Sequence, residues 1–343
     1  MSLSARSMSV LKILLRIGIG VGLLAFLIWW NWENIARLQG QRIRWGFLLA
    51  ALLISLAATL LTFLRWHLLV VAQSLPFRVR DCLRIGFVGF LFSQVIPGSV
   101  SGDLVKVWML AREQERRTVA VATVVLDRIV GLYALALVTG LAALVSWPAL
   151  RQVPALRDLV MWVVVVVAAG TAGFVALFAP FLVRGKWIES LARIRFAGGL
   201  IRELFGAIAV YQGKWPVILT SILISVLGHV GFASSLYCVA AALQGPLWPA
   251  RVHYVVAPLG LMINAVPTSP GGLGVGEAAM QFLFNAVGED GGKAFLMMLG
   301  FRATFWVISL IGLGYFLRGF SETRRAMTDA AANVSARSAD GVA

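Results

Sequence analysis

Carboxylates are scarce in this sequence, where 15 Asp and Glu residues stand against 30 Lys and Arg residues in a chain of 343. Charged residues make up only 13% of the chain, while hydrophobic residues make up 60%. A water-soluble domain carries about 25% charged residues. The low charge content therefore excludes an ordinary soluble domain and predicts a protein that crosses a membrane several times.

Cysteine and histidine are also rare, with two cysteines and three histidines. Cys82 and Cys238 each lie in an apolar stretch, so we interpret them as buried thiols rather than as a disulfide framework or a metal site. His67, His229 and His253 are scattered without the spacing of a metal-ligand motif. We therefore expect no metal, no cofactor and no enzyme, and a membrane-embedded lipid transferase is kept only as an alternative.

The surplus of basic residues lies in short segments beside the apolar stretches, without a nucleic-acid-binding module. This placement predicts contact with anionic lipid headgroups and no nucleic acid partner. The segments that the positive-inside rule places in the cytoplasm are 1–9, 78–84, 112–117, 184–214 and 318–325. Arg37, Arg42 and Arg44 oppose this orientation and are outnumbered. Segment 184–214 fits either a helix lying on the membrane or a solvated linker.

Residues 10–320 are predicted to form one transmembrane domain, followed by a disordered cytoplasmic tail at 321–343. The stretches long enough to span are approximately Val10 to Trp30, Trp45 to Ala72, Thr118 to Val145, Leu159 to Leu182, Pro216 to Leu243 and Ala294 to Leu317. Two further apolar stretches, 83–110 and 252–287, are interrupted by Pro and Gly. Lipid cannot satisfy the backbone groups that an interruption frees, so we expect re-entrant pairs of half-helices, with tilted and kinked spans as the alternative.

The two interrupted stretches share a motif. The first copy comprises Pro97, Gly98, Gly102, Asp103 and Arg128, and the second comprises Pro270, Gly272, Gly276, Glu277 and Arg302. In both copies a carboxylate follows the second glycine, and the arginine comes at the same distance further along the chain. We interpret this as an internal repeat, about 45–145 and about 216–317. The prediction is an all-α polytopic membrane protein with about six spanning helices and two broken re-entrant helix pairs in inverted repeats.

The motif concentrates charge near the middle of the membrane. Arg128 and Arg302 are predicted to lie about 12–15 Å into their helices, where an unpaired arginine costs at least about 2.5–3.5 kcal/mol. Asp103 and Glu277 are the expected partners, and the half-helix N-termini at each break favour an anion. We interpret the motif as a site for an anionic lipid headgroup. The alternative is structural, with close glycine packing and buried ion pairs that fix the fold.

Three segments, SQVIPGSVSGDLVKVWML, VVLDRIVGLYALAL and NAVPTSPGGLGVGEAAM, resemble the transmembrane region of lysylphosphatidylglycerol synthetases. That region is the flippase part of multiple peptide resistance factors, and stand-alone membrane proteins share it, some of them associated with hopanoid biosynthesis. The resemblance covers about residues 10–320 and implies a multi-pass protein of the bacterial inner membrane that moves lipid between leaflets. No aminoacyltransferase domain follows residue 320, so we expect this chain not to synthesise lipid.

The resemblance gives the lipid-handling role to Pro97, Gly98, Gly102, Asp103, Asp127, Arg128, Pro270, Gly271, Gly272, Gly274 and Glu277. The charge and repeat patterns add Ser101, Asn264, Gly276, Gln281 and Arg302 as candidate contacts. Ser101 replaces a glycine of the family motif and can cap its half-helix, and Gln281 extends a polar face beyond Glu277. The expected function is a flippase or transporter of phospholipid or another anionic lipid. The alternative is a non-catalytic membrane partner of a lipid-modifying enzyme, and the oligomeric state stays open.

Overall fold

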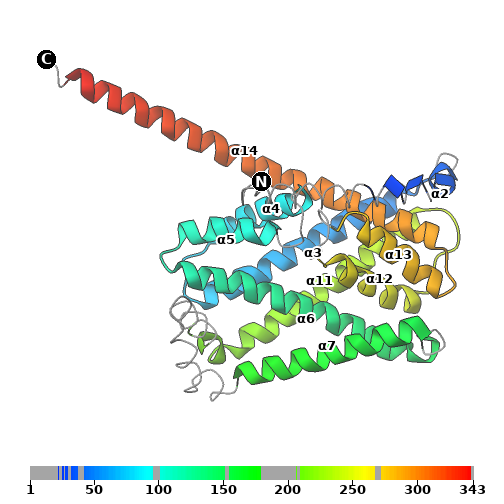
Figure 1. Cartoon of the computed structure of the whole chain (residues 1–343). Coiled ribbons are helices and arrows are strands. Elements are labelled where there is room, and N and C mark those ends of the chain that lie inside the picture. The colour runs from blue at the N-terminus through cyan, green and yellow to red at the C-terminus, as the bar shows by residue number, and fades with distance from the viewer. Residues whose placement is uncertain are drawn as a thin grey trace, which may run out of the picture.

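The computed structural model describes residues 32–37, 42–95, 101–150, 154–178, 209–266 and 272–340, with isolated positions between 22 and 29 and at 206. Every regular element in these ranges is a helix (Figure 1). The helices are α2 (Trp32–Arg37), α3 (Trp45–Ala72), α4 (Val79–Val95), α5 (Ser101–Glu113), α6 (Arg117–Leu150), α7 (Pro154–Phe178), α11 (Trp215–Ala242), α12 (Ala250–Asn264), α13 (Val275–Ala286) and α14 (Gly291–Asp340). The predicted all-α polytopic fold is confirmed.

Five helices in the described part of the chain are long and apolar enough to cross a membrane. Their spanning portions are Trp45–Ala72, Arg117–Trp147, Arg157–Ala176, Trp215–Ala242 and Gly291–Gly319. These correspond to five of the six predicted spans. The sixth, Val10 to Trp30, falls outside the described residues except for isolated positions, and so does most of the basic segment 184–214.

The sequence of α3 explains its length and its end. Leu and Ala, both strong helix formers, dominate its 28 residues, and it contains no proline. The helix ends at Ala72, because Ser74 takes a left-handed conformation with a φ of 58° and Pro76 cannot continue a helix. The chain therefore turns sharply before α4 begins.

Helices α3 and α11 pack against each other along their length and run antiparallel. At one end the Arg44 N–H donates to the Ala242 carbonyl oxygen at 3.1 Å. At the other end the Lys214 ammonium donates to the Ala72 carbonyl oxygen at 2.6 Å. Between these ends small residues meet at the interface: the Ser55 and Ser235 hydroxyl oxygens lie 2.7 Å apart, and Gly231 packs against Ala58. Small residues let the two backbones approach closely, which is the usual way for helices to associate in lipid.

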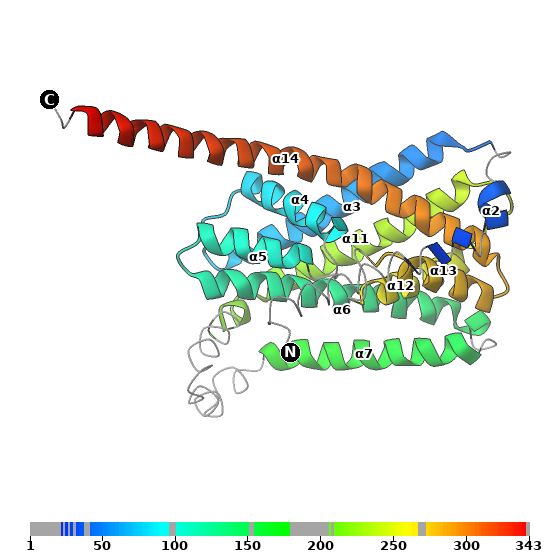
Figure 2. The ribbon, with the colours of Figure 1, turned by 45° about the horizontal axis from the view of Figure 1, so that its top comes forward.

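The two interrupted stretches form helical hairpins. Helix α4 packs against α5, and α12 packs against α13 (Figures 1 and 2). The first hairpin opens beside Ala72, where Arg84 near the start of α4 pairs with Glu113 at the end of α5 at 2.7 Å. The second opens at the other end of the bundle, where Lys293 donates to the Pro246 carbonyl oxygen at 2.8 Å. Each stretch therefore turns back on itself, and the two hairpins enter from opposite ends.

The helix contacts of the two halves correspond to one another. In the first half α3 touches α4 and α6, and α5 touches α6; in the second half α11 touches α12 and α14, and α13 touches α14. Contacts between the halves also correspond, because α4 packs on α14 while α12 packs on α6. With α3 and α11 antiparallel, this pattern has the form of an inverted repeat.

Gly102 allows the first hairpin to close. A Cβ atom at this position would overlap the Gly89 carbonyl oxygen on α4. We expect Gly102→Ala to force α4 and α5 apart and to lower the free energy of unfolding by about 1–3 kcal/mol. Gly314→Ala on α14 is the matched control, since no atom lies within 4 Å of a Cβ there. Thermal unfolding of both variants in detergent tests this, and equal melting temperatures would contradict it.

The last helix continues past its spanning portion. Helix α14 runs on from Gly319 to Asp340 and projects beyond the bundle (Figures 1 and 2). A spanning helix that is already formed can extend without a new nucleation step, and alanine and arginine favour such an extension. The disorder expected of segment 321–343 stays a prediction.

Candidate functional site

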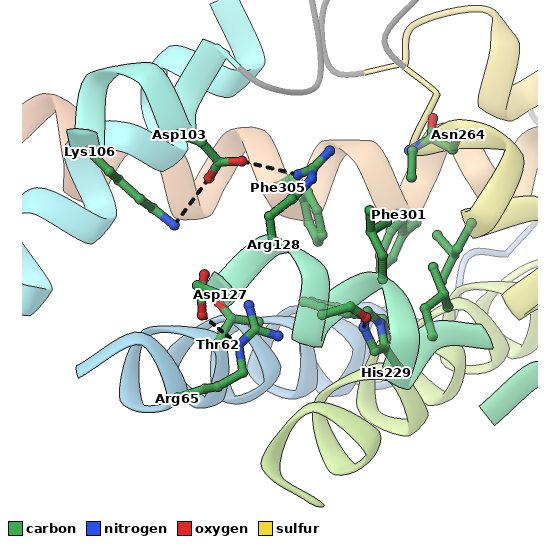
Figure 3. Close-up of a pocket in the computed structure, with 16 residues that line it drawn as sticks. Thr62, Arg65, Asp103, Lys106, Asp127, Arg128, His229, Asn264, Phe301 and Phe305 are labelled. Carbon is green, nitrogen blue, oxygen red and sulfur yellow. Dashed lines mark hydrogen bonds and ion pairs between the residues drawn. The ribbon is translucent and has the colours of Figure 1, made fainter. Parts of the chain in front are cut away.

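A polar cavity of about 270 Å³ lies between the two halves of the bundle (Figure 3). Helices α3, α5, α6, α11, α12 and α14 all contribute to its wall. Its polar lining residues are Thr62, Arg65, Asp103, Lys106, Asp127, Arg128, His229 and Asn264. Polar and ionisable side chains are costly inside a membrane, so those that line a cavity there are expected to be functional.

The charged groups come from well inside the bundle. Arg128 follows the start of α6 at Arg117 by 11 residues, or about 16 Å at 1.5 Å per residue. Asp103 precedes the end of α5 at Glu113 by 10 residues, or about 15 Å. Since α5 and α6 meet at the same end of the bundle, the carboxylate and the guanidinium reach the same depth. That depth is near the middle of a hydrocarbon core about 30 Å thick.

Asp103 lies between two cations, one on its own helix and one on α6. Its Oδ1 atom is 3.6 Å from the Lys106 ammonium, and its Oδ2 atom is 3.3 Å from the Arg128 guanidinium (Figure 3). The predicted pairing of Asp103 with Arg128 is therefore present, at a distance longer than that of a strong charge-assisted hydrogen bond. The Arg128 side chain remains 35% exposed. The Lys106 ammonium also lies over the Trp66 ring, 5.3 Å from its centroid.

The equivalent pair in the second repeat is tighter. The Arg302 Nε atom lies 2.5 Å from Glu277 Oε1, and a second Arg302 nitrogen donates to Oε2 at 3.0 Å. Glu277 is fully buried, and its Oε2 atom also accepts the Gly274 N–H at 2.8 Å. A third interaction joins Arg302 to the Gly272 carbonyl oxygen at 3.2 Å. This network uses several donors and acceptors of both side chains.

The two pairs therefore differ in kind. The Glu277 side chain is one methylene longer than that of Asp103. Both of its carboxylate oxygens therefore reach Arg302, and Oε2 also accepts the Gly274 N–H at the start of α13. The shorter Asp103 approaches the Arg128 guanidinium no closer than 3.3 Å. The structural interpretation of the repeat fits the pair of Glu277 and Arg302. The binding interpretation fits Arg128, whose partly exposed guanidinium can bind phosphate with two parallel N–H donors.

A further ion pair, with both side chains buried, lies in the cavity wall, and it was not predicted from the sequence. The Arg65 Nε atom lies 2.6 Å from Asp127 Oδ1, and another Arg65 nitrogen donates to the Ser225 hydroxyl at 2.9 Å. The pair joins α3, α6 and α11. Arg65 was detectable, because a charged residue inside an apolar span needs a partner, but the sequence does not say which carboxylate it meets.

A second cavity of about 220 Å³ adjoins the first. The two share Arg128, Asn264, Ala265, Phe301 and Phe305, and the second adds Ser93, Gln94 and Arg302 among its polar lining. Phe301 and Phe305 lie next to each other, with ring centroids 4.6 Å apart. Arg128 thus stands in the wall between two polar spaces.

Cationic side chains outnumber anionic ones in the lining of the 270 Å³ cavity. Among the described lining residues three are cationic, Arg65, Lys106 and Arg128, and two are anionic, Asp103 and Asp127. A ligand that carries one negative charge would balance them. Across the described part of the chain, no three His, Cys, Asp or Glu side chains come together as a metal site requires.

The other predicted site residues fall into three groups. Pro97, Gly98, Pro270 and Gly271 lie outside the described residues. Ser101, Gly102, Gly272, Gly274 and Gly276 shape the hairpins: the Ser101 hydroxyl donates to the Phe92 carbonyl oxygen at 3.4 Å, and Gly272 and Gly274 have φ values of 73° and 81°. Gln281 is half-buried on α13 and lines neither cavity, so the structure does not bring it to the others.

The fold and the cavity define a polytopic membrane protein with charged polar spaces between two similar halves. Comparison with protein families matches residues 13–312 to the family described as Lysylphosphatidylglycerol synthase TM region, and the chain belongs to that family. The resemblance found in the sequence is thereby confirmed. No curated protein and no solved structure matches the chain.

Proposed function

We propose that the protein is a lipid flippase, which moves phospholipid or another anionic lipid between the leaflets of the bacterial inner membrane. The observation that carries this proposal is the cavity with excess positive charge around Arg128, at the middle of a membrane bundle. The chain belongs to the family described as Lysylphosphatidylglycerol synthase TM region, and this membership supports a lipid-related role. Inverted repeats whose broken helices meet at mid-membrane are common in transporters, which supports movement rather than binding alone.

Arg128 and Lys106 are the groups that would hold the headgroup phosphate. Both contact Asp103 at distances above 3 Å, so a phosphate can replace the carboxylate as a closer partner. Asp103 would take the cations back when the phosphate leaves. In this scheme Arg128 always has an anionic partner, which avoids the cost of an unpaired charge in the membrane.

The lipid tails would stay in the bilayer during this movement. Leu132 lines the cavity and is 46% exposed on α6, which supports a lateral opening of the cavity at this residue. Val125 and Ile129, at neighbouring helical positions, are about as exposed as Leu132. A headgroup could therefore enter the polar space while its acyl chains remain against the apolar surface of α6.

Headgroup selectivity tests the proposal. Liposomes that contain purified protein are loaded with fluorescent phosphatidylglycerol or phosphatidylcholine, and leaflet redistribution is followed by chemical quenching of the outer leaflet. We expect the anionic lipid to move faster by about tenfold, because the cavity has one positive charge to balance. The proposal would be overturned if neither lipid moved faster in liposomes that contain the protein than in protein-free liposomes.

The length of the carboxylate side chain at position 103 should control the rate. Asp103→Glu is expected to hold Arg128 with both oxygens, as Glu277 holds Arg302, and to slow movement of the anionic lipid about tenfold. Asp103→Asn is the control, because it removes the competing charge and leaves both cations available. The same redistribution assay compares the two variants. Faster movement by the glutamate variant than by the asparagine variant would refute the exchange of partners at Arg128.

A further inference from the structure

A separate hollow of about 620 Å³ lies on the outer side of the first hairpin. It is bounded by residues 84–92 of α4, 105–113 of α5 and 315–319 of α14, and we call it the hairpin groove. Helix α4 lies between α5 and α14 in this region (Figure 2). The volume of the groove is within the range of pockets that hold small molecules.

The hairpin groove is charged at one end and apolar along the rest of its length. Arg84, Arg112 and Glu113 lie where the hairpin opens. Phe92 follows Arg84 by eight residues, so it lies about 12 Å deeper along α4. Val105 precedes Arg112 by seven residues, or about 10 Å along α5. The groove is thus charged near the membrane surface and apolar at depth. A phospholipid in one leaflet has the same order, with a charged headgroup at the surface and acyl chains below it.

Arg112 is placed to bind an anion at this mouth. Its guanidinium lies over the Trp108 ring, 4.7 Å from the ring centroid, and no ion pair joins it to a carboxylate of the described residues. A cation–π contact does not require the N–H donors of the guanidinium, so these donors can bind an anion. Arg84 is held differently, with one nitrogen 2.7 Å from Glu113 and 3.8 Å from Asp81. Arg112 is therefore the main anion contact, with Arg84 beside it.

We infer that the hairpin groove is a second lipid site, which binds an anionic phospholipid of the adjoining leaflet. The phosphate lies on the N–H edge of Arg112, and one acyl chain lies along Val105, Met109 and Phe92. Charge complementarity at the mouth selects an anionic headgroup. Trp108 and Phe316 are exposed at the groove beside a spanning helix, so the chain can enter directly from the bilayer.

The second site is distinct from the central cavity and goes beyond the proposed transport. Helix α5 separates the two, because Asp103 and Lys106 line the cavity whereas Trp108 and Arg112 line the groove. Binding in the groove does not require that the lipid cross the membrane. The two proposals can therefore fail independently.

Native mass spectrometry of the full chain with added phosphatidylglycerol tests the site. Arg112→Ala should weaken binding of one lipid about tenfold. Val105→Trp, which fills the groove and leaves the charges in place, should have a similar effect. Arg157→Ala, at an exposed ion pair on α7, is the matched control and should bind like the wild type.

Three results would overturn the inference. The first is unchanged lipid binding by both Arg112→Ala and Val105→Trp. The second is equal binding of phosphatidylcholine and phosphatidylglycerol by the wild type. The third is a change in oligomer mass instead of lipid number in the Val105→Trp variant, which would indicate a protein in the groove. If any of these occurs while Arg128→Ala still slows lipid movement, the groove proposal fails and the proposed transport stands.

Discussion

Replacing Glu277 by alanine is expected to lower the free energy of unfolding by about 3–5 kcal/mol. The substitution would leave the Arg302 guanidinium, only 4% exposed, without its carboxylate. It would also remove the acceptor of the Gly274 N–H at the start of α13. Chemical unfolding of the purified variant in detergent measures the loss.

A double variant and a surface variant make this prediction specific. Glu277→Met combined with Arg302→Leu should recover most of the stability, because apolar residues of similar volume replace both charges. Asp158→Ala, which breaks the exposed ion pair of Arg157 and Asp158, should change the stability by less than about 1 kcal/mol. If Glu277→Ala is no more destabilising than Asp158→Ala, the buried pair does not hold the second hairpin.

Replacing Arg128 by alanine is expected to slow lipid movement by about 10- to 100-fold while the protein stays folded. Arg128 stands between the two cavities, and its ion pair with Asp103 is long and partly exposed. Its loss should therefore remove the phosphate contact at a smaller cost in stability than the loss of Glu277. The leaflet redistribution assay with phosphatidylglycerol measures the rate.

A control variant shows whether losing an arginine elsewhere in the protein also slows lipid movement. Arg157→Ala removes an exposed arginine on α7 and should move lipid at the wild-type rate. The melting temperature of each variant, measured in parallel, separates slow movement from misfolding. Wild-type movement by a folded Arg128→Ala protein would remove Arg128 from the lipid path.

Much of the architecture was predictable because it follows from patterns in a single chain. Apolar length alone located the spanning helices of the described residues. The Pro and Gly interruptions located the hairpins, because only a buried or wet environment tolerates broken helices in lipid. The repeat of glycine, carboxylate and arginine also predicted both partners correctly, since Asp103 meets Arg128 and Glu277 meets Arg302.

The differences between the repeats were not predictable from their shared pattern. Two pairs with the same spacing have different geometries, because one methylene decides whether the carboxylate reaches its arginine with both oxygens. The pairing of Arg65 with Asp127 joins helices far apart in the chain, and no spacing rule indicates such a contact. Gln281 shares a helical face with Glu277 but lies one turn further from the start of α13, about 6 Å along the helix, and it lines neither cavity.

The most direct test of the account is capture of a lipid headgroup at the wall between the two cavities. A photoreactive benzoylphenylalanine replaces Phe305, which lines both cavities, and the protein is irradiated in liposomes of mixed phosphatidylglycerol and phosphatidylcholine. The same group at Trp162, exposed on α7, reports the surrounding bilayer. We predict that position 305 is enriched in phosphatidylglycerol joined through its headgroup or glycerol, whereas position 162 captures both lipids through their acyl chains. Equal capture of both lipids at position 305, or no capture there, would contradict a headgroup path past Arg128.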